Sequence, residues 1–108
     1  MKNEVAIKQV GNPNVLTFDF SNFEENINEG NSLVLENEDD VECEEFNLPK
    51  TTKDLCHELF SIDGIFEINL FTKRIFITKL SSFEWKDLLP KIIKALKKIF
   101  GGDLETTN

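Results

Sequence analysis

The chain has 108 residues, with 12 basic and 20 acidic side chains that give a net charge of −8. A chain this short predicts one domain, which buries about 60–70% of its unfolded surface. Its negative charge repels phosphate backbones, so we expect no nucleic-acid partner. No apolar run approaches the roughly 18–20 residues that cross a bilayer, so we expect no membrane partner either.

The negative charge is concentrated in the first half of the chain. Residues 1–49 carry a net charge of −10, whereas residues 50–108 carry +2. Seven of the ten residues at 36–45 are acidic, and such a run repels itself and makes a poor core element. We therefore expect an acidic insertion that forms a solvated, mobile loop or extends an edge strand. A surface that binds a partner or a metal ion is the alternative.

The first half of the chain predicts a β-hairpin. Val5-Ala6-Ile7 followed by Val10 indicates a short strand, and residues 15–20 alternate apolar and polar side chains as a half-buried strand does. Between them, Gly11-Asn12-Pro13-Asn14 favours a turn, because Gly and Asn tolerate positive φ and Pro fixes φ. The weaker segments that follow are a loop at 21–31, a strand at 32–35 and a short strand at 46–48.

A helix and a second hairpin are predicted next. Thr51 or Thr52 can cap a helix over residues 53–62 by accepting a hydrogen bond from a free backbone N–H. Residues 65–70 and 74–80 are dense in Ile and Phe, and the short connection between them allows only a hairpin turn.

The last predicted helix is strongly amphipathic and extends to Phe100. It is expected to begin at Ser81 or Ser82, because Ser81 and Glu84 match a capping box. Pro90 should bend it, since proline donates no helical hydrogen bond. Residues 103–108 are expected to be a frayed tail or the start of a linker.

These elements predict the α+β class. We expect a small single-domain sandwich over residues 1–102, with an antiparallel or mixed sheet of four to five strands and two helices on one face. The expected order is β-β-(β)-α-β-β-α.

The residues that could bind metal are few. Cys43 and Cys56 form no Cys-x-x-Cys pair, and His57 is the single histidine. Zinc and iron–sulfur sites need three or four soft ligands, so no metal site is predicted within one chain. Cys56 falls on the apolar face of its helix and is interpreted as a core residue. Cys43 remains the one weak candidate for a metal ligand.

Catalytic patterns are absent from the sequence as well. No Ser or Asp is tied to His57 by a spacing typical of a triad, and the five glycines form no phosphate-binding loop. We therefore expect no enzyme.

Four short segments follow one another across residues 5–100. They are Asn-Pro-Asn-Val-Leu-Thr-Phe at 12–18, Leu-Phe-Ser-Ile-Asp-Gly-Ile at 59–65, Phe-Ile-Thr-Lys at 76–79 and Trp-x-x-Leu-x-Pro-x-Ile at 85–92. Each is weak alone, but their order and spacing together resemble the N-terminal domain of NifU-like (Nfu-type) iron–sulfur scaffold proteins. The resemblance does not extend to that family's C-terminal domain, whose Cys-x-x-Cys binds a [4Fe–4S] cluster.

The resemblance implies a non-enzymatic interaction or accessory module of iron–sulfur cluster assembly or delivery. Because the sequence lacks that Cys-x-x-Cys, the family's cluster chemistry is not carried over, and we expect that the module does not itself ligate a cluster and has no cofactor. Assembly or recipient proteins are the implied partners, and we expect a monomer. The expected location is the bacterial cytoplasm or, less favoured, the mitochondrial matrix after processing. The candidate interaction residues are Asn12, Pro13 and Asn14 in the turn, and Lys91, Lys94, Lys97 and Lys98 on the last helix.

Other interpretations stay open. The turn residues can be purely structural, and the lysines can form a solvated face or contact the chain's own acidic stretch. Cys43 could ligate a metal ion or a cluster across a dimer. The chain could also be a diverged binding module with an unrelated partner.

Overall fold

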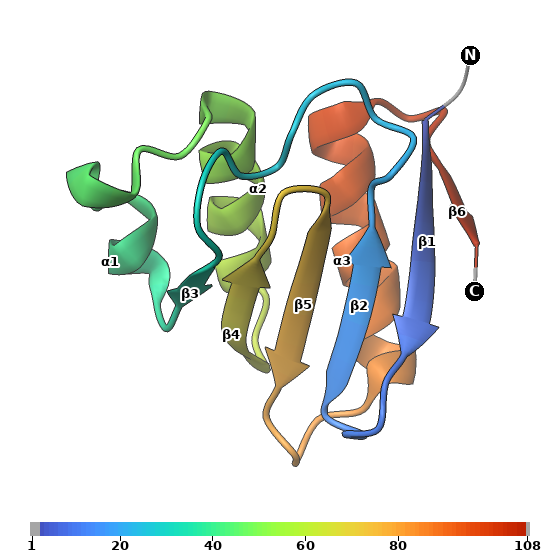
Figure 1. The fold of residues 1–108 in the computed structure, drawn as a ribbon. Coiled ribbons are helices and arrows are strands. Elements are labelled where there is room, and N and C mark those ends of the chain that lie inside the picture. The colour runs from blue at the N-terminus through green and yellow to red at the C-terminus, as the bar shows by residue number, and fades with distance from the viewer. Residues whose placement is uncertain (1–2, 108) are drawn as a thin grey trace.

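The computed structural model describes residues 3–107 and shows a sheet backed by helices (Figure 1). What was expected of residues 1, 2 and 108 lies outside this range. The elements within it are β1 (Glu4–Gln9), β2 (Val15–Asp19), β3 (Leu33–Leu35), α1 (Glu38–Val41), the 3₁₀ helix η1 (Glu44–Phe46), α2 (Lys50–Phe60), β4 (Ile65–Leu70), β5 (Arg74–Lys79), α3 (Trp85–Phe100) and β6 (Glu105–Thr107).

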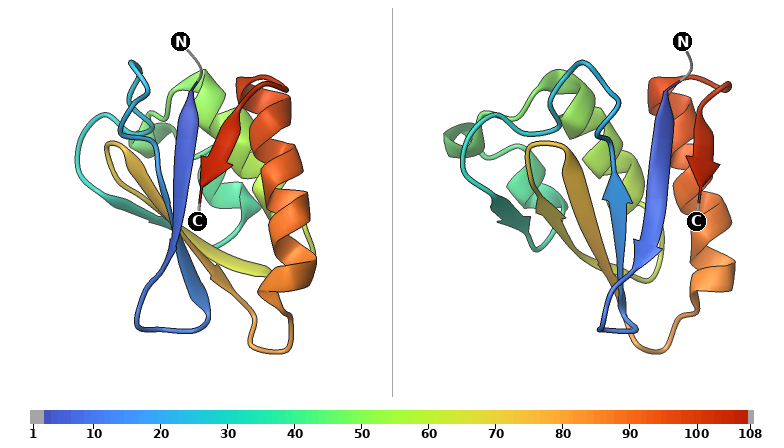
Figure 2. Two further views of the ribbon diagram at one scale, coloured as in Figure 1. Left: turned by 90° about the vertical axis from the view of Figure 1, so that its right-hand side faces the viewer. Right: turned by 45° about the vertical axis from the view of Figure 1, so that its right-hand side comes forward.

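The sheet has six strands in the order β3-β4-β5-β2-β1-β6. Neighbouring strands are antiparallel except β1 and β6, which are parallel. Helices α2 and α3 cover one face, and no helix covers the other across the described residues (Figures 1 and 2). The predicted α+β class, the mixed sheet and the two helices on one face are confirmed, although the sheet has one more strand than expected.

The core lies between the helices and the covered face of the sheet. Alternate residues of β2 and β5 turn inward, so that Phe18, Ile75 and Ile77 are each at most 1% exposed. From the helix side, Leu59 and Ile92 are completely buried. Helix α3 therefore buries the apolar stripe that its sequence predicts. None of the described helices is long and apolar enough to cross a membrane.

Strand β6 replaces part of the expected frayed tail. Glu105 and Thr107 pair in parallel register with Glu4 and Ala6 of β1. Leu104, just before the strand, is only 4% exposed and packs into the core. The expectation of a frayed end is therefore wrong for residues 105–107, because a buried leucine anchors them against the first strand.

The acidic stretch also differs from its expectation. Instead of a loop or an edge-strand extension, it forms α1 and η1. The side chain of Asn37 caps α1 by accepting a hydrogen bond from the Asp40 amide (3.2 Å). Val41 is completely buried and fixes the helix against the core. Residues 46–48 form no strand, since the chain turns at Asn47 with φ of 47°.

Both long helices begin where the sequence did not predict. α2 starts after Pro49, and Thr52, expected as a cap, is 2% exposed and donates its hydroxyl to the Ile27 carbonyl (2.5 Å). α3 starts after Glu84 without a side-chain cap, so the predicted capping box is wrong. The Phe83 amide bonds to the Leu80 carbonyl (3.1 Å), and this turn delays the helix.

Candidate functional site

The turn between β1 and β2 is held by its own asparagines. Asn12 accepts a hydrogen bond from the Asn14 amide through its side-chain oxygen (2.9 Å) and another from the Val15 amide through its carbonyl (3.1 Å). This local bonding is the ordinary action of asparagine in a turn. Asn12 and Pro13 are exposed, whereas Asn14 is half-buried.

Two residues that are distant in sequence fasten this turn to the rest of the fold. The Lys79 amide donates to the Asn14 carbonyl (2.8 Å), and the Lys79 ammonium donates to the Asn14 side chain (3.0 Å). The Trp85 indole N–H donates to the Pro13 carbonyl (2.9 Å). Lys79 is only 8% exposed and lies over the Trp85 ring, 5.9 Å from its centre. Three of the four sequence segments thus meet at one end of the sheet.

The remaining segment supplies Gly64, between α2 and β4. Its φ is +102°, and a Cβ at this position would lie 2.6 Å from the Phe83 ring. Only glycine satisfies both conditions without strain. Like the asparagine turn, this residue specifies the fold, and neither arrangement places a nucleophile beside a base.

The lysine face of α3 borders a crevice toward the end of α2. Lys91, Lys94 and Lys98 line it together with Glu58 and Asp63, and its volume is about 420 Å³. Lys98 pairs with Glu58. Lys97 is also exposed but does not line the crevice. The structure therefore brings together three of the four lysines named from the sequence, on an exposed basic surface of an acidic protein.

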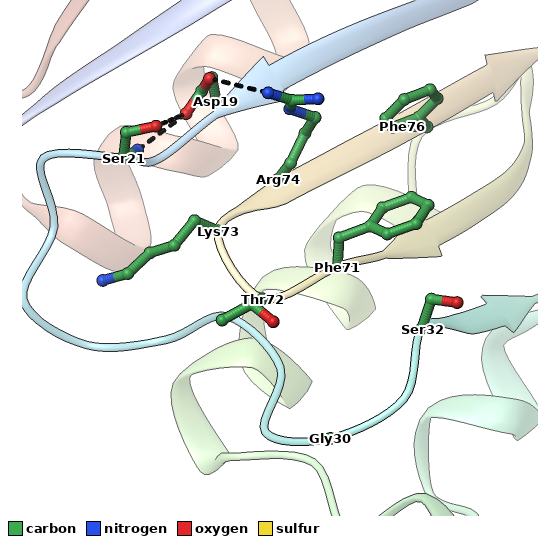
Figure 3. A pocket seen from close by; sticks show the side chains of 9 residues that line it. All are labelled: Asp19, Ser21, Gly30, Ser32, Phe71, Thr72, Lys73, Arg74 and Phe76. Atoms are coloured by element: carbon green, nitrogen blue, oxygen red, sulfur yellow. Dashed lines mark hydrogen bonds and ion pairs between the residues drawn. The ribbon is translucent and has the colours of Figure 1, made fainter.

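A second hollow, of about 350 Å³, opens on the uncovered face where β4 turns into β5 (Figure 3). Phe71 and Phe76 lie beside each other there, with ring centres 5.2 Å apart. Arg74 pairs with Asp19 (3.4 Å), and the Ser21 amide and hydroxyl both donate to Asp19 (amide, 2.9 Å). This hollow was not predicted from the sequence, because no local pattern places the residues after β2 against the β4–β5 turn.

The charged side chains of this hollow, Asp19, Lys73 and Arg74, already have hydrogen-bond or ion-pair partners. Hydrogen bonds from Ser21, and to a smaller extent the Arg74 charge, hold the pKa of Asp19 below its usual value. Lys73 donates to the Phe23 and Glu25 carbonyls and fixes the loop between β2 and β3. The Ser21 hydroxyl is thus bonded to a carboxylate, whereas a serine nucleophile needs a base such as histidine. No histidine is among the residues that line this hollow.

The profile of the family described as "Scaffold protein Nfu/NifU N terminal" matches residues 5–102. The chain belongs to this family. No curated protein sequence matches it.

Several solved structures share the fold of this domain. The crystal structure of SAV1430 from Staphylococcus aureus has a TM-score of 0.65 at 15% identity, covering 89% of this chain and 99% of that one. A NifU-like protein from Saccharomyces cerevisiae has a TM-score of 0.64 at 21% identity, covering 95% and 83%. SeR13 from Staphylococcus epidermidis has a TM-score of 0.51 at 23% identity, covering 91% and 98%. At these identities the likeness shows the fold alone.

The two cysteines of this Nfu-type domain lie in different environments. Cys56 is completely buried on α2, and burial raises the pKa of its thiol to about 12. A thiol held protonated in the core is a poor metal ligand. Cys43 is half-buried and precedes η1. Among residues 3–107, no three His, Cys, Asp or Glu side chains are grouped to hold a metal ion.

His57 has a structural role that the sequence analysis did not anticipate. Its Nδ1 lies 2.8 Å from Glu38 and its Nε2 lies 2.5 Å from Glu42, so both ring nitrogens face carboxylates. Glu42 also lies 3.8 Å from Lys53. The ion pairs shown for the acidic stretch therefore join it to α2. The alternative contact between this stretch and the α3 lysines is not among these ion pairs. The four-residue spacing of Glu38 and Glu42 was the available signal, because it places both on one helical face.

Proposed function

We propose that this domain is a non-enzymatic interaction module of iron–sulfur cluster assembly or delivery, and that it does not itself ligate a cluster. The observation that carries the proposal is the family match over residues 5–102, combined with a Cys56 thiol that is buried and protonated. A domain of this family without an accessible pair of thiols can contribute by binding proteins that hold or receive the cluster.

The lysine crevice is the surface we propose for such a partner. Lys91 and Lys94 are exposed on the helix face beside Glu58 and Asp63, and the apolar side chains of Ile62 and Ala95 line the same crevice. Basic side chains around a partly apolar depression favour an acidic partner surface, because opposite potentials accelerate encounter and fix orientation. The proposed contact should therefore weaken as ionic strength rises.

This proposal is tested by measuring binding to purified cluster-assembly and recipient proteins of the same organism. We expect at least one of them to bind, and Lys91→Glu/Lys94→Glu to weaken that binding by about tenfold. Lys50→Glu/Lys86→Glu is the matched control, since it changes the net charge equally at exposed lysines outside the crevice. Equal loss in both double variants would argue against a specific surface on α3, and failure of every such protein to bind would remove the proposal.

The absence of cluster ligation is a separate part of the proposal. After anaerobic reconstitution with iron and sulfide, we expect no stoichiometric cluster on the purified chain. A stable cluster that is lost in Cys43→Ser would instead favour ligation by Cys43 across a dimer.

The bacterial cytoplasm and a monomeric state complete the proposal. Analytical ultracentrifugation of the purified chain measures the oligomeric state directly. A dimer in dilute solution would contradict it.

A further inference from the structure

Among the described residues, 3–107, the outer edge of β1 is only partly paired. Strand β6 runs parallel to β1, and their register ends at the pair of Ala6 and Thr107. Figure 2 shows β6 beside the first part of β1, with the rest of β1 continuing past it toward the turn. Within residues 3–107, Lys8 and Gln9 therefore have a strand partner only on the β2 side.

The unpaired part still presents main-chain hydrogen-bonding groups. The Glu105 amide donates to the Asn3 carbonyl (3.1 Å), so the odd-numbered residues of β1 direct their main-chain groups toward this edge. Gln9 is the odd-numbered residue that lies past the end of the register with β6. Its N–H and C=O are oriented for an additional strand.

An apolar groove lies directly beside this edge. Its volume is about 510 Å³, and Ile7, Gln9, Leu16, Trp85 and Leu89 line it together with Lys8. The bond from Trp85 to the Pro13 carbonyl fixes one wall. Ile7 and Leu16 are the floor, at 4% and 7% exposed. The groove is therefore formed by side chains whose positions the fold already determines.

We propose that this edge and groove bind an extended segment of a partner protein, which adds to the sheet along β1 in continuation of β6. Main-chain groups on one side and a pocket for alternate side chains on the other are the two requirements for binding by strand addition. Three residues suffice for a strand in this sheet, since β3 and β6 each have three. The segment would turn an apolar side chain into the groove and place an acidic one near Lys8.

The opposite edge of the sheet is a less favourable site. There, β3 lies beside the acidic helix α1 (Figure 1), and a helix or charged side chains at an edge discourage strand addition. The β1 edge has a basic residue, Lys8, where the other has acidic ones. An acidic–apolar segment is therefore expected at β1 and not at β3.

The test uses the whole chain and random peptides displayed on phage. Selected peptides are synthesised and titrated into the isotopically labelled protein, and amide and indole shifts are followed by NMR. We expect selected sequences that alternate apolar and acidic residues, with the largest shifts at Ile7, Lys8, Gln9 and the Trp85 indole. Intermolecular contacts between peptide and β1 backbone should be observed directly.

Two variants address the two halves of the site. Gln9→Pro removes the main-chain N–H that faces the outer edge, and a strand edge tolerates proline. Leu89→Ser removes an apolar side chain from the wall of the groove. Each should weaken peptide binding by about tenfold. Val34→Ser, which removes an apolar side chain 47% exposed on β3, is the matched control and should bind normally.

Several outcomes would overturn the proposal. They are the selection of no peptide, shifts confined to other surfaces, or unchanged binding in both Gln9→Pro and Leu89→Ser. A concentration-dependent dimer that Gln9→Pro abolishes would assign the edge to a second copy of the chain instead. Binding at the β1 edge is independent of the proposed lysine surface, so Lys91→Glu/Lys94→Glu should leave peptide binding intact. Failure of one proposal is therefore distinguishable from failure of the other.

Discussion

Single residues in this domain show how short sequence segments specify a fold. Asn14 and Lys79 are separated by 65 positions, yet they share both a main-chain and a side-chain hydrogen bond. Burying a lysine is costly unless its ammonium finds partners, and here Asn14 and the Trp85 ring provide them. The turn, the lysine and the tryptophan are therefore one structural unit, although they come from three separate segments.

Gly64 permits a sharp prediction at this scale. Gly64→Ala should lower the free energy of unfolding by about 1–3 kcal/mol, because alanine at this φ is strained and its Cβ would overlap the Phe83 ring. Urea denaturation followed by circular dichroism measures the change. Gly11→Ala is the matched control, since a Cβ there meets no atom within 4 Å. A Gly64→Ala protein as stable as the control would show that Phe83 moves aside at no cost.

At the scale of elements, the helices and strands that can be predicted from the sequence are those that a local pattern determines. The two hairpins and α3 were predicted because alternation, turn residues and helical spacing are each visible within a short window. α1 and β6 were not, since their order depends on Val41 and Leu104 entering a core made by distant residues. Short elements of this kind carry little local signal, and tertiary contact decides them.

Among the candidate binding surfaces too, some can be predicted from a local pattern and others depend on tertiary contacts. The lysine face of α3 could be read from helical spacing alone, whereas its crevice depends on how α2 packs beside α3. The hollow beside Phe71 and the groove beside β1 could not be predicted, because each joins segments that only the tertiary fold brings together.

The contact between α1 and α2 predicts a dependence of stability on pH. Hydrogen bonds that the His57 ring donates to Glu42 and, to a smaller extent, Glu38 raise the pKa of His57 above its ordinary value of 6.5. A folded-state pKa raised in this way contributes stability that is complete below the unfolded value and is lost as pH rises through the folded value. The domain should therefore lose stability as pH increases from 6.5 upward.

Two measurements check this effect. NMR titration of the His57 ring should give a pKa above 6.5, and urea midpoints across the same range should fall with rising pH. His57→Gln should remove that part of the pH dependence, whereas Glu45→Gln, at another exposed acid of the stretch, should preserve it. A normal His57 pKa would mean that the two glutamates do not hold the ring in solution.

At the scale of the whole molecule, charge and sheet order are related. The acidic α1 lies beside the β3 edge, whereas the lysines belong to α3, one of the two long helices behind the sheet (Figures 1 and 2). One sheet edge is thus shielded by charge, while the other depends on β6 for cover. Within residues 3–107, β6 pairs with β1 only as far as Ala6, so the two edges of the sheet differ in how they are covered.

Strand β6 also predicts that the domain does not end with its last helix. A chain truncated after Gly102 should lose about 2–5 kcal/mol of unfolding free energy, because it removes Leu104, which is 4% exposed, and the parallel partner of β1. It should also aggregate more readily, since the whole outer edge of β1 becomes free to pair with other chains. Urea denaturation measures the loss of stability, and light scattering measures the aggregation.

Two variants of the 108-residue chain are the controls. Leu104→Ala should reproduce most of the stability loss without the aggregation, because it retains β6. Thr107→Ala should change neither stability nor aggregation. A truncated chain as stable as the full one would show that the residues after Gly102 are dispensable, and that the core closes without Leu104.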